Sequence, residues 1–138
     1  MAAKDFYHHQ VKRALVKDGW RITDDPFQIS LEGIDFDIDL AAEPLLAADK
    51  DGEKIAVEIK SFMGPSNVNE FHKAVGQFVD YYVALEILAP ERVLYLAIPK
   101  YTYETFFQKT IVQKALKLIE AKILVYDPEL EIIIKWIK

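Results

Sequence analysis

Two charged side chains lie two residues apart in an apolar segment near the middle of the chain. Glu58 and Lys60 fall within Ile55–Phe62, where they alternate with Val57 and Ile59. Side chains two positions apart on a β-strand project from the same face of a sheet. The pattern therefore predicts a strand that presents a carboxylate and an ammonium group together, while the alternating apolar pair enters the protein interior.

An acidic segment precedes this strand and can supply a second carboxylate. Residues 34–40 alternate apolar and acidic side chains, which predicts a strand whose acidic face includes Asp39. We expect this strand to continue through residues 45–48 after a bulge at Pro44. Asp51-Gly52 favours a hairpin turn, so the acidic face should lie beside the returning strand.

Two carboxylates and a lysine on adjoining strands predict a metal-dependent site for phosphodiester cleavage. A hard cation such as Mg²⁺ (or Mn²⁺) binds oxygen ligands and often uses only one or two protein carboxylates. The cation polarises a phosphate and lowers the pKa of a bound water, and a lysine can position that water or stabilise the transition state. The simpler alternative is a solvated ion pair between Glu58 and Lys60, which contributes less than about 1 kcal/mol. A second triplet of this type, Glu120–Lys122, is expected at a helix end.

The rest of the chain alternates periodic segments with short breaks, which predicts a mixed α/β domain. Helices are expected over 6–17, over 68–88, and over 101–121 as one or two helices with Thr110 as a cap. The expected order is helix, three strands, helix, strand, helix, two strands, with a central mixed sheet flanked by helices. The expected extended segments are 20–29, 34–48, 55–62, 92–98, 123–126 and 131–137.

Composition and charge exclude several classes of protein. The chain has 138 residues, 51% of them hydrophobic, and no cysteine, which excludes a disordered tail, a disulfide framework and thiolate metal sites. The longest apolar run, Val93–Ile98, is far shorter than the roughly 18 residues of a membrane span. We therefore expect a cytoplasmic protein without a membrane partner. Residues 1–90 carry nine Lys/Arg and sixteen Asp/Glu, whereas residues 91–138 carry eight and six, which argues against DNA binding through bulk charge.

The segment Ile55–Phe62 resembles the third strand of the PD-(D/E)XK nuclease superfamily. The resemblance implies a restriction-endonuclease-like fold, so that residues 1–138 form a single endonuclease-like domain. The superfamily core of a helix, three antiparallel strands, a helix and a further strand agrees with the expected order of elements. The resemblance also implies that an acid on the preceding strand completes the site formed by Glu58 and Lys60.

Three acids are candidates for this position. A four-residue loop at 49–52 would place Glu43 directly opposite Glu58. The superfamily pattern favours Asp39, although Ile38 stands where that pattern has proline. In order of preference, the candidates are Asp39, Glu43 and Asp37.

Five blocks that extend over nearly the whole chain are similar to the XisH family, whose members are named fdxN-element excision controlling factors. This resemblance implies a role in the programmed excision of a DNA element, in support of a site-specific recombinase. It also implies DNA and a small XisI-type protein as partners. An accessory factor of this kind can keep a nuclease fold while only binding DNA or a partner. The blocks are Ala3–Asp5, Lys17–Thr23, Asp39–Glu43, Ile55–Gly64 and Tyr95–Ala97.

Three further residues are expected to border the site. Gln77 and Tyr81 are four apart and share a helix face, and they resemble a Gln-x-x-x-Tyr element that contacts DNA in some nucleases of this superfamily. His8 stands where the superfamily often carries an acid on its first helix. It can be a metal ligand or a phosphate contact, and an ordinary surface histidine is the simpler interpretation.

The leading hypothesis is therefore a DNA-element excision factor with a Mg²⁺-dependent (or Mn²⁺-dependent) endonuclease-like site. Asp39, Glu58 and Glu43 would bind the metal. The catalytic residues would be Asp39, Glu58 and Lys60, and Lys60 would position the water or stabilise the transition state. The alternative is a non-catalytic DNA- or partner-binding accessory factor that controls a site-specific recombinase. A third hypothesis is a homo-oligomer that pairs through the apolar C-terminal strand.

Overall fold

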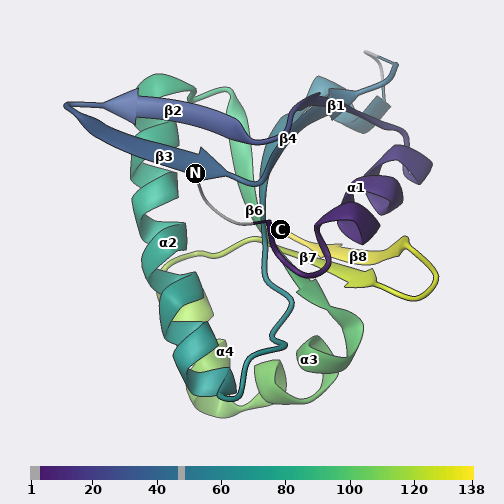
Figure 1. Ribbon diagram of the computed structural model, residues 1–138, viewed down its shortest axis with the longest axis vertical. Helices are drawn as coiled ribbons and strands as arrows, with labels where there is room; N and C mark the ends of the chain where they lie inside the picture. Colours follow the sequence, from purple (N-terminus) through teal and green to yellow (C-terminus); the bar gives the residue numbers. More distant parts are fainter. Residues whose placement is uncertain (1–3, 47–48) are drawn as a thin grey trace.

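A six-stranded mixed sheet forms the centre of the protein in the computed structural model, which describes residues 4–46 and 49–138 (Figure 1). Its strands are β1 (Trp20–Asp24), β4 (Leu40–Pro44), β5 (Lys54–Ile59), β6 (Arg92–Pro99), β7 (Ile123–Asp127) and β8 (Ile132–Ile137), and a separate ribbon consists of β2 (Phe27–Leu31) and β3 (Ile34–Ile38). The order in the sheet is β1-β4-β5-β6-β7-β8. The pairs β5–β6 and β6–β7 are parallel, and the other three are antiparallel. The expected mixed α/β class is confirmed.

Helices cover both faces of this sheet. The helices are α1 (His8–Lys17), α2 (Asn67–Leu88), α3 (Lys100–Glu104) and α4 (Thr110–Leu118). α1 packs on one face, whereas α2 and α4 pack on the other, so the sheet separates two apolar cores (Figure 1). In β6, Leu94 and Leu96 enter the core beneath α2, while Tyr95 and Ala97 enter the core beneath α1. This burial on both faces explains why the strand is a continuous apolar run. Within the described residues, no helix combines the length and the apolar character needed to cross a membrane.

The long helix α2 forms where its sequence predicts it. The Ser66 hydroxyl accepts a hydrogen bond from the backbone N–H of Asn69 at 3.2 Å, which satisfies one of the donors that the first turn leaves unpaired. Phe71, Phe78 and Leu85 recur at helical spacing and are buried against the sheet. The expected division of 101–121 into two helices is confirmed, but Thr110 is the first residue of α4 and Lys109 is its N-cap residue; a short 3₁₀ turn separates α4 from α3.

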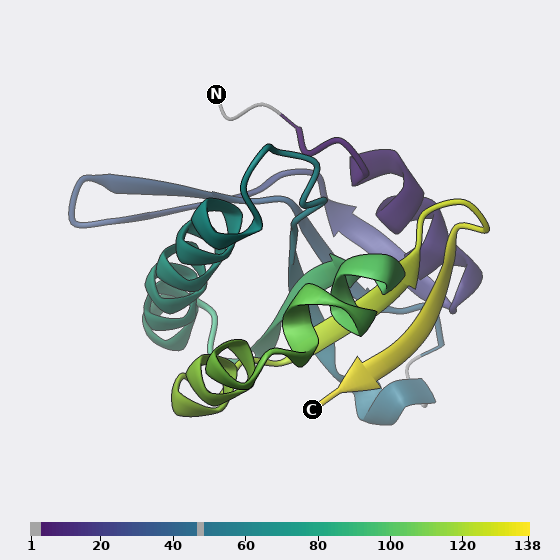
Figure 2. The same ribbon diagram turned by 90° about the horizontal axis from the view of Figure 1, so that it is seen from below.

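The acidic segment 34–40 is not one continuous strand, so this part of the prediction is wrong. Its first five residues, β3, pair with β2 in the ribbon, which projects beyond α2 (Figures 1 and 2). Glu32 and Gly33 join the two strands with positive φ angles of 50° and 80°, the backbone geometry of a tight two-residue hairpin. The chain then breaks at Asp39 before it enters β4. Five strands rather than three therefore precede α2.

β4 and β5 pair antiparallel, as expected, but their connection differs from the predicted hairpin. Residues 49–52 form a turn in which Lys50 and Asp51 have positive φ angles of 52° and 58°. The strand does not continue through residues 45 and 46, which lie exposed outside the sheet. Residues 47 and 48 lie outside the described part of the chain. The register is Leu40–Val57, Ala41–Ala56 and Ala42–Ile55.

Candidate active site

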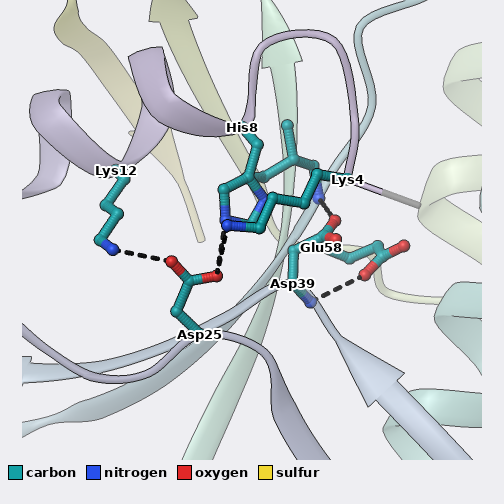
Figure 3. A network of polar contacts seen from close by, with 7 residues as sticks. Lys4, His8, Lys12, Asp25, Asp39 and Glu58 are labelled. Carbon is teal, nitrogen blue, oxygen red and sulfur yellow. Dashed lines mark hydrogen bonds and ion pairs between the residues drawn. The ribbon is translucent and has the colours of Figure 1, made fainter. Parts of the chain in front are cut away.

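Asp39 lies at the break between β3 and β4, where it is held against β5 by two hydrogen bonds. Its Oδ2 accepts the backbone N–H of Ile59 at 2.7 Å, and its own backbone N–H donates to Glu58 Oε1 at 3.3 Å (Figure 3). The β4–β5 ladder has ended by this point, at Leu40 and Val57. The Asp39 carboxylate thus takes the place of a strand partner, because a buried backbone N–H must find an acceptor. The break in the strand is what brings this carboxylate to Glu58.

Glu58 and Lys60 lie on the same face of the sheet, as their spacing predicts. Glu58 is only 5% exposed, and its Oε2 lies 3.7 Å from the Nζ of Lys60, whose side chain is 14% exposed. The backbone carbonyl of Lys60 accepts a hydrogen bond from the Tyr126 hydroxyl at 3.2 Å. The strand end that carries the lysine is therefore anchored from β7.

Asp39 opposes the ionisation of Glu58, whereas a hydrogen bond with Glu58 favours the ionised form of Asp39. Burial, and then the charge of Asp39, raise the pKa of Glu58 to about 9, against the lowering effect of Lys60. Burial also raises the pKa of Asp39, although the Ile59 N–H and the neighbouring charge of His8 favour its ionised form. Two carboxyl groups that share a site commonly keep one proton between them. At neutral pH this pair consequently retains a proton.

A proton held between two buried carboxylates is what a divalent cation can replace. Within residues 4–46 and 49–138, no group of three or more His, Cys, Asp or Glu side chains is arranged to hold a metal ion. Asp39 and Glu58 offer a two-carboxylate donor set, which suits Mg²⁺ because this cation usually keeps several waters and binds substrate phosphate. The residues present thus fit a hard cation that is completed by water and a phosphate.

The other two acidic candidates do not join the pair. Glu43 forms an ion pair with Arg21 on β1. The register that would place Glu43 opposite Glu58 does not occur, because Ala42 already lies opposite Ile55 and Glu43 continues away from the site. Asp37 belongs to the ribbon, and its backbone carbonyl accepts a hydrogen bond from Tyr81 at 3.3 Å.

Tyr81 and Gln77 stand on the face of α2 toward the ribbon and the carboxylate pair. Burial, and then the charges of Glu58 and Asp39, raise the pKa of the Tyr81 hydroxyl. Gln77 lies one turn earlier on the same face, and its Oε1 is buried without a hydrogen-bond partner among the described residues. The structure therefore brings Tyr81 to the border of the site and leaves an unpaired amide oxygen one turn away.

His8 is buried rather than on the surface, which corrects the simpler interpretation of this residue. It is 2% exposed, and its Nε2 lies 2.7 Å from Oδ1 of Asp25. Lys12 Nζ donates to the other carboxylate oxygen, also at 2.7 Å. Burial alone would raise the pKa of Asp25, but the hydrogen bonds from Lys12 and His8 outweigh it and hold the pKa below its usual value. Because ionised Asp25 only accepts, Nε2 of His8 carries a proton and donates it to Asp25.

Asp25 is the site residue that the sequence analysis missed. Figure 3 shows the His8 ring between Asp25 and Asp39, and the charge of His8 acts on Asp39. The Nδ1 of His8 is buried without a hydrogen-bond partner in the part of the chain that the structure describes. Asp25 precedes Pro26 in an ordinary turn sequence, and its contact with His8 spans 17 residues. No local pattern of residue types could have indicated it.

The fold and the site together define a class of protein. It is a mixed α/β domain in which a buried carboxylate pair and a lysine meet where two antiparallel strands part. The family model described as "XisH protein" matches residues 1–134. The chain belongs to the XisH family, and the resemblance predicted from its sequence is confirmed.

Two crystal structures are similar to this chain over almost their whole length. One is an XisH family protein from Nostoc punctiforme, with 48% identity, a TM-score of 0.89, and coverage of 97% of this chain and 100% of the other. The second is a fdxN element excision controlling factor protein from Anabaena variabilis, with 48% identity, a TM-score of 0.87, and coverage of 96% and 98%. No curated protein matches the chain.

Proposed function

We propose that this protein takes part in the control of DNA-element excision and carries a divalent-metal-dependent site of the PD-(D/E)XK type. The name of the Anabaena variabilis protein, a fdxN element excision controlling factor, supports the first part. The family resemblance adds DNA, a small XisI-type protein and a site-specific recombinase as proposed partners. The second part rests on the chemistry of three side chains.

The observation that supports cleavage most strongly is the convergence of Asp39, Glu58 and Lys60. The two carboxylates would hold Mg²⁺ or Mn²⁺, and the cation would supply polarisation of the phosphate and a water of lowered pKa. Lys60 Nζ stands 3.7 Å from Glu58, so its ammonium group can offset the negative charge that accumulates on the phosphate during hydrolysis. Tyr81 and His8 border the same place from α2 and α1. Hydrolysis adds water across one P–O bond and leaves a phosphate monoester and a hydroxyl.

Cleavage of supercoiled and branched DNA in the presence of Mg²⁺ or Mn²⁺ tests this proposal. We expect activity in the unmodified protein and a loss of at least about a hundredfold in Glu58→Gln and Lys60→Met, as for other groups that stabilise a charged transition state. Glu43→Gln is the matched control, because Glu43 is an acid on the neighbouring strand that faces Arg21 instead. Activity that persists in the first two variants would refute the assignment of the site.

Metal binding can be measured separately from cleavage. Because the Asp39–Glu58 pair retains a proton at neutral pH, binding of Mn²⁺ should release up to about one proton per metal ion. Calorimetry in two buffers of different ionisation enthalpy measures this release. We expect Glu58→Gln to abolish the binding and Glu43→Gln to preserve it.

One observation favours the non-catalytic alternative, an accessory factor that only binds DNA or a partner. Glu58 is 5% exposed, and both of its carboxylate oxygens already have neighbours, the Asp39 N–H and Lys60. In that case the pair serves to close the end of β5, and calorimetry should detect no Mn²⁺ binding that depends on Glu58. Cleavage and metal binding would then both be absent.

A further inference from the structure

A cavity lies on the flank of α2 that faces away from the carboxylate pair. It has a volume of about 730 Å³, within the size range of ligand-binding pockets. It is lined by residues of α2, α3, the end of α4, and the strands β7 and β8; Figure 2 shows the C-terminal end of β8 beside the segment that leads from α4 into β7. The lining residues on which the argument rests are Tyr82, Tyr103, Lys117, Glu120, Lys122 and Lys138.

The charge of this cavity is opposite to that of the whole chain. The lining has three lysine side chains, Lys117, Lys122 and Lys138, and one acidic side chain, Glu120, so its charged side chains sum to +2, while the protein carries −5. A further cation, Lys135, lies 4.6 Å from the centre of the Tyr103 ring. The cavity therefore brings together three of the eight Lys/Arg of residues 91–138 and favours an anion.

An aromatic ring is presented beside these cations. Tyr82 is 47% exposed, although α2 buries its neighbours Phe78 and Leu85. Its ring is nearly parallel to that of Phe78, at 21° with 6.4 Å between the ring centres, so Phe78 supports one side of the ring. Tyr81 points instead toward Asp37, which separates this surface from the candidate active site. Lysines along a groove with an open aromatic ring are typical of proteins that bind single-stranded nucleic acid, in which phosphates meet the cations and bases stack on the ring.

We propose that this cavity binds single-stranded nucleic acid, with Lys117, Lys122 and Lys138 contacting phosphates and Tyr82 stacking on a base. The proposal does not depend on cleavage at Asp39 and Glu58, since it concerns a different surface of the protein. An acidic segment of a protein could also form ion pairs with the lysines, but its carboxylates would not stack on the exposed face of Tyr82. The tyrosine thus discriminates between the two ligands.

Fluorescence anisotropy with labelled oligo(dT) and oligo(U), in EDTA, tests the proposal without involving a metal site. Binding of either strand supports it, and the stronger of the two identifies the sugar that the cavity prefers. Each phosphate contact to a single strand contributes about −0.7 to the slope of log K against log salt. Three lysines therefore predict a slope of roughly −2, which is a loss of affinity of about 20-fold between 50 and 200 mM salt.

Variants distinguish binding at this cavity from nonspecific electrostatic attraction between the protein and the strand. Lys117→Gln combined with Lys122→Gln should reduce the salt slope by about 1.4. The matched control is Lys114→Gln, a lysine one turn earlier on α4 that does not line the cavity, and it should leave the slope unchanged. Glu120→Gln removes the acidic side chain of the cavity and should increase the affinity for the strand, a result that misfolding of the variant could not produce. A control variant that weakens binding as much as the double variant would overturn the proposal.

The stacking contact has its own test. Tyr82→Ala should weaken binding about fivefold or more, and Tyr82→Phe should restore it to within about twofold, because stacking needs the ring and not the hydroxyl. Oligo-glutamate of matched length is the competitor. If it displaces the strand as effectively as unlabelled oligo(dT), and Tyr82→Ala binds normally, the cavity binds acidic protein segments and the nucleic-acid proposal is wrong.

Discussion

Glu58→Gln tests the electrostatics of the carboxylate pair most directly. Burial and the charge of Asp39 raise the pKa of Glu58 to about 9 in the folded protein, from an ordinary value of 4.5. Between these two values the folded protein holds a proton that the unfolded chain has released. The folded state then binds more protons than the unfolded state, so the free energy of unfolding falls as the pH rises.

The size of this effect follows from the separation of the two pKa values. Within the window, each pH unit lowers the free energy of unfolding by up to about 1.4 kcal/mol. From pH 6 to pH 8 the free energy of unfolding should therefore fall by as much as about 3 kcal/mol. Glutamine is neutral and has the shape of the protonated acid: its oxygen can still accept the Asp39 N–H, and its amide can donate to the Asp39 carboxylate. Glu58→Gln should therefore remove this part of the pH dependence and be more stable than the unmodified protein at pH 8.

Urea unfolding followed by circular dichroism at pH 6, 7 and 8 measures this slope. Glu104→Gln is the matched control, because Glu104 is an exposed glutamate on the short helix α3 and its replacement should leave the slope as it is. Equal pH slopes in Glu58→Gln and the unmodified protein would refute the reasoning, since the buried pair would then hold no proton at neutral pH.

Three further substitutions probe the neighbours of the pair and the core. Lys60→Met removes the charge that lowers the pKa of Glu58, so in the same unfolding series the loss of stability should extend to higher pH; an unchanged profile would contradict this. Asp25→Asn removes the ionised acceptor shared by His8 and Lys12 and should lower the free energy of unfolding by about 1–3 kcal/mol at pH 7, and a neutral result in urea would show that these contacts contribute nothing. Phe107→Ala leaves a cavity at a fully buried position and should lower the free energy of unfolding by about 3–5 kcal/mol in the same urea titration. A decrease below ~1 kcal/mol would mean that neighbouring side chains fill the cavity.

Local sequence patterns predicted much of the fold because the signals involved are short-range. The apolar spacing of α2 with a serine at its start, the run Val93–Ile98 that became β6, and the break before Thr110 each depend on neighbours within a few residues. Glu58 and Lys60 share a face for the same reason, since their spacing alone decides it. The family resemblance was likewise carried by contiguous blocks.

The acidic segment shows where local patterning failed. Alternation of apolar and acidic residues is equally compatible with one long strand and with two strands divided by a break, because side chains keep the same period of two. The Glu32-Gly33 turn paired the first half of the segment with β2, and the second half joined the central sheet. The position of the break, and hence the role of Asp39, depended on which partner strand each half found.

The amino-acid sequence by itself determined the class of fold, the family, and the one strand that carries a carboxylate and a lysine on the same face, because each of these depends on residue types at fixed local spacing. Only the tertiary structure decided which acid meets Glu58, that His8 is buried against Asp25, and that three lysines from the acidic chain gather around Tyr82. These sites bring together residues up to 56 positions apart, since Tyr82 and Lys138 line the same cavity. Their proximity follows from sheet register and helix packing, which no short stretch of sequence specifies.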